Sequence, residues 1–238
     1  THSPGQLNAF IINAKGVTPD IDLPGFITGF MIFLLMFDSQ KIADTYDQIA
    51  LNFSATRQKM SPEVISLIPA LPQKAQVLDL GCGNGVLLSA LPKTVNYTGV
   101  DFSAVLIKEA TGSNPEVKFV LADILDQSIW DGLGQFDFIA ALAVFHHLPS
   151  PADHIKLLRN IKHHLRSDGS ALISVWRLDQ PKFNRYRRGK YLSIPFHGGS
   201  SRDFYSFTKN ELVNLAKQLG FSDIKTVVIK DNLYLKLA

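Results

Sequence analysis

Val-Leu-Asp-Leu-Gly-Cys-Gly-Asn-Gly, residues 77–85, is a short apolar run that passes directly into a turn with glycine at every second position. An apolar run of this length predicts a buried strand. Glycines let the backbone adopt positive φ and approach a ligand closely. A helix predicted over Leu87–Leu91 would point its free N–H groups and positive dipole end at the same place. The turn alone is a weak signal, because turns use glycine for purely conformational reasons, and its G-x-G-x-G spacing differs from the dinucleotide pattern G-x-G-x-x-G.

Short apolar runs alternate with helical patterns from Asp38 to the end of the chain. Strands are predicted over Val77–Leu80, Tyr97–Val100, Val117–Val120, Phe136–Ala140, Ala171–Trp176, Ile224–Ile229 and Leu233–Leu237. Helices are predicted over Ile42–Phe53, after Pro62 with Ser61 as N-cap, and over Leu87–Leu91, Ala104–Ala110, Ala152–Leu165 and Lys209–Leu219, the last ended by Gly220. This order predicts an α/β fold: a mostly parallel, Rossmann-like sheet with helices on both faces. The last two strands predict an antiparallel C-terminal hairpin.

Two acidic residues follow the next predicted strands. Asp101 comes at the end of the second strand, where a carboxylate can accept both hydroxyls of a ribose. Asp123 follows the third strand and can accept from an exocyclic amine, with Ile124 against a purine face. Taken singly, each acid is as well explained as a solvated loop residue. Three such features at successive strand ends favour a ligand site, because ligands of open α/β sheets bind at that edge.

Composition indicates an ordinary globular protein. The 238 residues are 46% hydrophobic and 19% charged, which excludes disordered, collagen-like and coiled-coil chains. A single cysteine, Cys82, excludes an internal disulfide and a cysteine-cluster metal site, so we predict no metal and a reducing, cytoplasmic location. The net charge is +3, but residues 177–202 hold seven basic residues and one acid, so the rest of the chain sums to −3.

The first 37 residues differ from the rest. Residues 23–37 read LPGFITGFMIFLLMF, which is short for a membrane span and a poor match to a secretory signal. We therefore predict no membrane span, an N-terminal apolar segment (1–37) outside the fold, and one domain over 38–238. We expect a natural start at Met31 or Met36, which the intact mass of natively expressed protein would test. A membrane-surface anchor is the competing interpretation.

Residues 75–238 resemble the class I S-adenosylmethionine-dependent methyltransferases. The resemblance rests on V-L-D-L-G-C-G-N-G, on Asp101, on Ala122-Asp123 and on the terminal hairpin. It implies S-adenosylmethionine as cofactor, its methionine part held by the turn, its ribose by Asp101 and its adenine by Asp123 and Ile124. The full set of cofactor residues that it implies is Tyr46, Asp79, Gly81, Cys82, Gly83, Asn84, Gly85, Asp101, Phe102, Asp123, Ile124 and Ala143. Cys82 is expected to be a small turn residue, and a catalytic thiol is not expected.

A narrower resemblance is to the tRNA wobble-uridine carboxymethyl methyltransferases. It rests on the segments 42–50, 53–57, 143–148, 172–176 and 202–207. It implies methylation of the carboxylate of 5-carboxymethyluridine in the tRNA anticodon loop, and a small zinc-binding activator subunit as in eukaryotic relatives. Two departures, Ser167-Asp168-Gly169 in place of a Pro-Gly-Gly turn and a varied aromatic segment at 203–206, put the substrate in doubt.

Methyl transfer to a carboxylate chiefly needs the alignment of the nucleophile, the methyl carbon and the sulfur. A carboxylate is already ionised near neutral pH, so no strong general base is required. The site then needs a cation to hold the acceptor, and arginine suits a carboxylate. We predict Arg57, Arg202, His146 and His147 as the catalytic residues. Each arginine could equally be a surface residue, and a histidine pair at this place also occurs in small-molecule methyltransferases. The predicted substrate-binding residues are Arg57, His146, Arg185, Arg187, Arg188, Arg202 and Tyr205.

The basic segment, a predicted insert over 177–207, alternates basic and aromatic side chains, as expected for phosphate contacts and base stacking. A solvated loop is its alternative explanation. Three functions therefore stay open: the tRNA methyltransferase, a methyltransferase of a small metabolite such as a quinone, lipid or organic acid, and a non-catalytic cofactor-binding module. The insert favours the first over the second, and the acids with the histidine pair argue against the third.

Overall fold

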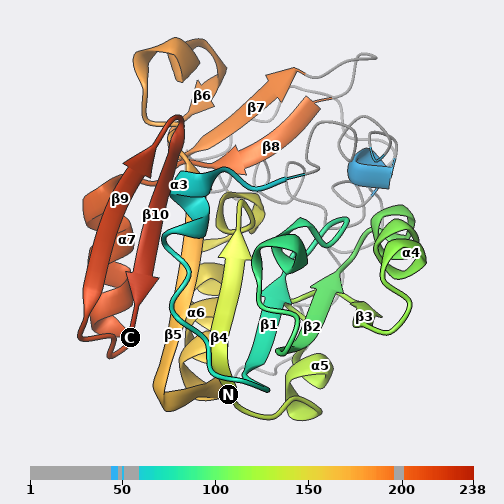
Figure 1. Cartoon of the computed structure of the whole chain (residues 1–238). Helices are drawn as coiled ribbons and strands as arrows, with labels where there is room; N and C mark the ends of the chain where they lie inside the picture. Colours follow the sequence, from blue (N-terminus) through green and yellow to red (C-terminus); the bar gives the residue numbers. More distant parts are fainter. Residues whose placement is uncertain (1–43, 48–49, 51–58, 196–200) are drawn as a thin grey trace, which may run out of the picture. The chain divides into compact units, whose positions relative to one another are not determined.

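The computed structural model describes residues 44–47, 50, 59–195 and 201–238 (Figure 1). The chain divides into the units Thr1–Leu35 and Met36–Ala238, and every described residue belongs to the second. The predicted apolar segment 1–37, its boundary, Arg57 and most of the helix predicted over Ile42–Phe53 lie outside the described residues. Residues 44–47, within that predicted helix, are helical.

A seven-stranded sheet forms the centre of the domain, in the order β3-β2-β1-β4-β5-β10-β9 (Figure 1). The first five strands are parallel, and β10 runs antiparallel to both β5 and β9. The bounds are β1 Gln76–Leu80, β2 Asn96–Asp101, β3 Lys118–Leu121, β4 Phe136–Leu142, β5 Leu165–Trp176, β9 Ile224–Ile229 and β10 Asn232–Leu237. The predicted fold class and the terminal hairpin are confirmed. Strand β5 begins earlier than predicted, and its register with β4 shifts between Phe136 and Phe138.

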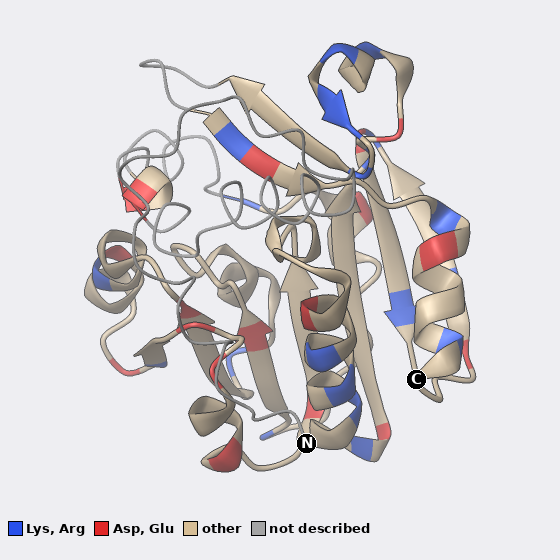
Figure 2. Ribbon diagram, turned by 180° about the vertical axis from the view of Figure 1, so that it is seen from behind, with Lys and Arg blue, Asp and Glu red and all other residues tan. Residues whose placement is uncertain are grey.

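Side-chain alternation along the strands builds one core on each face of this sheet. On β1, Leu78 and Leu80 belong to the core under α6 and α7, whereas Val77 belongs to the opposite core with Val64 and Leu87. Figure 2 views the sheet from the α6 and α7 side. Because both faces are covered, the parallel strands are buried, and their carboxyl ends meet at one edge.

The helices follow the sequence patterns with two corrections. The bounds are α3 Pro62–Ile65, α4 Ala104–Ser113, α5 Gln127–Asp131, α6 Pro151–His164 and α7 Lys209–Gln218. The helix predicted over Leu87–Leu91 is a short 3-10 helix, η1 Val86–Ala90, which follows the left-handed Gly85 and ends at the extended Leu91. The helix predicted after Pro62 is a single turn with Ser61 at its N-cap. Helix α7 begins with a Thr208–Glu211 capping box.

The insert predicted over 177–207 folds into a second, three-stranded antiparallel sheet. Its elements are η3 Pro181–Tyr186, β6 Arg187–Arg188, β7 Tyr191–Pro195 and β8 Ser201–Tyr205, in the order β6-β7-β8. Leu178, Leu192 and Phe204 form a small buried core beneath it. The alternative of a solvated loop is therefore wrong for the described part of this segment. None of the helices within the described ranges is long and apolar enough to cross a bilayer.

Candidate active site

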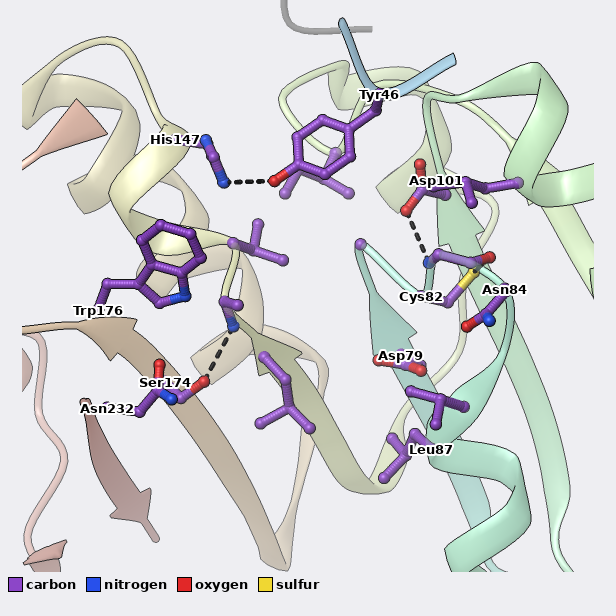
Figure 3. A pocket seen from close by; sticks show the side chains of 18 of the residues that line it. Tyr46, Asp79, Cys82, Asn84, Leu87, Asp101, His147, Ser174, Trp176 and Asn232 are labelled. Atoms are coloured by element: carbon purple, nitrogen blue, oxygen red, sulfur yellow. Dashed lines mark hydrogen bonds between the residues drawn. The ribbon is translucent and has the colours of Figure 1, made fainter. Parts of the chain in front are cut away.

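A cavity of about 470 Å³ opens at the carboxyl edge of the parallel strands, within the size range of small-molecule sites. Every predicted cofactor residue except Gly85 lines it. Figure 3 shows Asp79, Cys82 and Asp101 on one side of this cavity, and His147, Trp176 and Asn232 on the other. The chain therefore brings the predicted cofactor residues to one place.

The glycine turn that follows β1 requires glycine for its backbone conformation. Gly81, Gly83 and Gly85 have φ values of +68°, +54° and +79°, in the left-handed region. A Cβ atom on Gly81 would also lie 2.3 Å from Cγ2 of Val144. Gly85 faces away from the cavity, toward Phe119, so its role in the structure is to shape the turn rather than to line the site.

Asp101 fixes this turn to the end of β2. One of its carboxylate oxygens accepts the Gly83 N–H at 2.8 Å, and the other accepts the Ser103 N–H at 2.9 Å. Burial raises the pKa of the Asp101 carboxyl, and these backbone N–H bonds act against that rise. Each carboxylate oxygen has a second lone pair, so Asp101 can still accept a ligand hydroxyl from the cavity.

Asp79 is a buried carboxyl that faces the same cavity. Its Oδ2 atom accepts the Tyr97 hydroxyl at 2.7 Å. Burial raises the pKa of Asp79 to about 7, and the Tyr97 hydrogen bond lowers it in part. A cation in the cavity would favour the ionised form of this carboxyl. Burial also raises the pKa of the neighbouring Cys82 thiol, so Cys82 is a poor nucleophile.

Asp123 and Ile124 lie at the end of β3, on the same side as Asp101. Asp123 accepts the Leu125 N–H at 2.8 Å, which leaves its other carboxylate oxygen for a ligand. Ile124 is buried, and its carbonyl accepts the Trp130 indole N–H at 2.9 Å, so its side chain presents a fixed apolar surface to the cavity.

Tyr46 lies across the cavity, where it contacts His147 and Phe102. Its hydroxyl is hydrogen-bonded to Nε2 of His147 at 2.9 Å (Figure 3), and its ring meets Phe102 edge-on at 6.4 Å. Its neighbour Asp47 accepts the Ser103 hydroxyl and the Val105 N–H at the start of α4. A carboxylate is favoured at a helix N-terminus, so Asp47 stabilises the position of residues 44–47 over the cavity.

The two adjacent histidines have different positions. They belong to a 3-10 turn, η2 Phe145–His147, and His147 lines the cavity. His146 is fully buried, stacks on Trp176 at 5.4 Å, and accepts the Trp176 N–H at 3.4 Å. The prediction of His146 as a catalytic and substrate-binding residue is therefore not supported, because its ring lies beneath Trp176 rather than in the cavity. Just before this turn, Ala143 has a strained φ of +58°, and its N–H donates to Oγ of Ser174 at 2.9 Å.

Among the described residues, the arginines predicted to bind substrate lie outside the cavity lining, and Arg57 lies outside the described residues. Arg202 is predicted from the sequence to be a catalytic and substrate-binding residue. Its guanidinium packs over the rings of Trp176 and Phe204, at 5.2 and 5.5 Å, and it does not line the cavity. Tyr205, on the opposite side of β8, packs on His154. Arg202 therefore supports the site from behind Trp176.

The three arginines of the insert differ in exposure. Arg185 packs over Tyr186 at 4.7 Å and is exposed, as is Arg188. The guanidinium of Arg187 donates to the carbonyl of Leu178 and so has a structural role. Figure 2 shows basic residues along the segment from η3 to β6. Arg185 and Arg188 are thus the two members of this predicted set that remain accessible to a partner.

Sequence reasoning missed the side of the cavity formed by β5 and the terminal hairpin. Its polar and aromatic lining residues are Ser174, Trp176, Lys230, Asn232 and Tyr234. The available signal was topological. Because β10 runs antiparallel to β5, the turn between β9 and β10 has to lie at the carboxyl edge of the parallel strands. Lys59, just before α3, also lines the cavity and was not predicted.

These residues fit S-adenosylmethionine, which carries a sulfonium, an amine, a ribose and an adenine. Asp79 can face a cation, Asp101 a ribose diol and Asp123 an exocyclic amine, and the turn brings backbone close to a ligand. Within the described residues, no group of three or more His, Cys, Asp or Glu side chains could hold a metal ion.

Comparison with known proteins gives a family and several relatives. The family described as "Methyltransferase domain" matches residues 53–226. The tRNA (carboxymethyluridine(34)-5-O)-methyltransferase of Saccharomyces cerevisiae is 32% identical over 168 residues, which cover 71% of this chain and 56% of that protein. The trans-aconitate 2-methyltransferase of an Azoarcus species is 33% identical over 146 residues, covering 59% of this chain and 54% of that protein. The chain thus spans about half the length of these relatives.

Solved structures share the fold. The DhpI-SAM-HEP complex superimposes with a TM-score of 0.62 at 20% identity, covering 84% of this chain and 96% of that one. At this level of identity the likeness concerns the fold alone.

Proposed function

Because the chain belongs to the S-adenosylmethionine-dependent methyltransferase family, we propose that it methylates a carboxylate oxygen of its acceptor, and that this acceptor is 5-carboxymethyluridine at the wobble position of tRNA. The observation that carries the proposal is the division of the cavity. Acids from the ends of β1, β2 and β3 line one side, and Trp176, His147 and Lys230 line the other. The first side suits the cofactor, and the second suits an anionic acceptor.

For this methyl transfer the protein has mainly to bind the cofactor and the acceptor and to orient them. When bound, S-adenosylmethionine supplies an activated methyl group. A carboxylate acceptor has a pKa of about 4 and is ionised at neutral pH, so the site needs no general base. The residues of this chain have to hold the acceptor in line and keep competing water away. The thiol of Cys82, which lines the cavity and whose pKa is raised by burial, has no part in this proposal.

The names of the relatives support a carboxylate acceptor. The yeast relative is named for carboxymethyluridine, and the Azoarcus relative for trans-aconitate, and both of these acceptors carry carboxylates. The insert favours the RNA over the small acid, because Arg185 and Arg188 are exposed and Arg185 packs over the ring of Tyr186, an arrangement that suits phosphates and unpaired bases. The activator subunit implied by the resemblance stays a prediction.

The test uses two separate incubations of the protein with labelled S-adenosylmethionine. One contains tRNA whose wobble base is 5-carboxymethyluridine, and the other contains trans-aconitate. We expect base-labile label in the anticodon loop. Label in trans-aconitate alone would replace the RNA with a small organic acid as the acceptor. Label in neither pool, with the cofactor bound, would refute carboxylate methylation.

The role of the insert is tested with Arg185→Ala/Arg188→Ala, leaving Arg187 to hold the Leu178 carbonyl. We expect at least a tenfold loss of tRNA affinity at low salt, and unchanged cofactor affinity. The matched control is Arg159→Ala/Lys217→Ala, which removes the same charge from α6 and α7. If both double variants lower tRNA affinity equally, the insert has no specific role.

A further inference from the structure

Two neighbouring pairs of residues on β5 and β10 form a platform in the cavity. Trp176 lies directly opposite Asn232, and Ser174 lies directly opposite Tyr234. Directly opposed residues of an antiparallel pair project from the same face of the sheet, and so do residues two apart on one strand. All four line the cavity, and Figure 3 shows Ser174, Trp176 and Asn232 on the side opposite Asp101.

The platform is held in place from several directions. Ser174 accepts the N–H of Ala143 at 2.9 Å. Trp176 stacks on the buried ring of His146 and packs against the guanidinium of Arg202, which comes from the three-stranded sheet, and neither of these two residues lines the cavity. The indole is therefore a fixed surface, and its position depends on the insert. Such a rigid aromatic surface suits a planar ring.

Lys230 brings a positive charge to the rim of this platform. It occupies the turn between β9 and β10 with φ +53°, is exposed, and lines the cavity. The acids that line the cavity come from β1, β2 and β3, so at a strand spacing of about 4.8 Å they lie roughly 14 Å or more from β10. The acids are thus separated along the sheet from Lys230 at the platform, and Lys59, before α3, is the other lysine of the lining among the described residues.

Lys230 has two acidic neighbours, Glu63 and Asp231. Glu63, exposed on α3, has a pKa lowered chiefly by the Ser61 side chain and in small part by Lys230. Asp231, the next residue in the turn, is bound to Lys182 at 3.0 Å. Lys230 is therefore the cationic residue of this turn that lines the cavity, while the Asp231 carboxylate is paired with Lys182 of the insert.

We propose that this platform is the acceptor subsite for a planar ring that carries a carboxylate: the ring lies against Trp176, the Asn232 amide bonds the ring's polar edge, and Lys230 holds the carboxylate. The proposal rests on the proposed function. It replaces Arg202, predicted from the sequence, with Lys230 as a cation that faces the acceptor. An amide offers both a donor and an acceptor, which matches the alternating carbonyl and N–H groups of a uracil edge.

The test compares Lys230→Ala and Lys230→Arg with the wild type, using an anticodon stem-loop RNA that carries 5-carboxymethyluridine. Lys230→Ala should raise KM about tenfold at low salt, with a smaller change near 1 M salt because the pair is exposed to solvent. Lys230→Arg should restore most of the loss. Affinity for S-adenosylhomocysteine, measured by calorimetry, should change less than twofold. The control is Lys225→Ala, an exposed lysine at the other end of β9.

A binding experiment tests this subsite independently of the proposed function. The wild type should bind the carboxylate RNA more tightly than its neutral carboxamide analogue, and Lys230→Ala should lose that preference. Equal loss for both RNAs, or a KM within twofold of wild type, overturns the subsite while carboxylate methylation stands. If the wild type methylates nothing, the proposed function fails, and the carboxylate preference still decides the subsite by binding alone.

Discussion

Replacing Asp79 with asparagine should remove a pH dependence from the stability of the protein. Burial raises the pKa of Asp79 from 3.8 to about 7 in the folded state. The unfolded chain therefore loses this proton first as the pH rises. The folded protein is most stabilised by the protonated form below pH 4, and it loses that stability as the pH rises through about 7.

The size of the effect follows from the two pKa values. A difference of about 3 pKa units corresponds to about 4 kcal/mol in the free energy of unfolding, of which roughly 2 to 3 kcal/mol falls between pH 5 and pH 8.5. Asparagine is neutral at both pH values and keeps an oxygen for the Tyr97 hydroxyl. Asp79→Asn should therefore gain stability relative to wild type by about 2 kcal/mol on going from pH 5 to pH 8.5.

Urea unfolding of both proteins at the two pH values measures this double difference, with Asp168→Asn, an exposed aspartate, as the control. If the stability gap between wild type and Asp79→Asn is the same at pH 5 and pH 8.5, the raised pKa is refuted. The cofactor gives a second measurement, since a cationic ligand favours the ionised carboxyl. Wild-type affinity for S-adenosylmethionine should rise from pH 6 to pH 8, and that of Asp79→Asn should not.

Two further substitutions test the turn and the residue that lies across the cavity. Gly81→Ala should cost about 1 to 3 kcal/mol of stability, because alanine is strained at φ +68° and its Cβ atom would overlap Val144. Thermal unfolding measures this loss. The control is Gly112→Ala, in open space within α4, which should be neutral or stabilising. A Gly81→Ala protein as stable as wild type would contradict the argument. Tyr46→Phe should lower kcat/KM about two- to tenfold, because it removes the hydroxyl that is hydrogen-bonded to His147, and it should cost about 1 kcal/mol of stability or less. Unchanged kinetics would leave that bond without a catalytic role.

The cofactor side of the cavity could be predicted because its signals are local. A strand that ends in a glycine turn specifies its own geometry, and the strand order then brings Asp101 and Asp123 to the same edge. The parallel sheet follows from the alternation of strands and helices alone. These features do not depend on distant parts of the chain, which is why the sequence was sufficient for them.

The acceptor side could not be predicted in the same way. His146 and His147 are chemically identical, and only the 3-10 turn decides which ring faces the cavity. Arg202 looks like a loop arginine until β8 is known, since the pleat of that strand directs it onto Trp176. The assignment of Lys230 needs the register between β5 and β10, which pairs residues more than fifty positions apart.

The two hydrogen bonds that the Asp101 carboxylate accepts from the backbone have a practical consequence for genetics. A knockout allele made at this position would loosen the glycine turn and the start of α4 together, so a phenotype could reflect loss of the protein rather than loss of its chemistry. The Asp123 carboxylate, which lines the cavity and accepts the Leu125 N–H of its own loop, is the proposed adenine-binding acid whose mutation should disturb the scaffold less. Complementation studies should therefore be designed around Asp123.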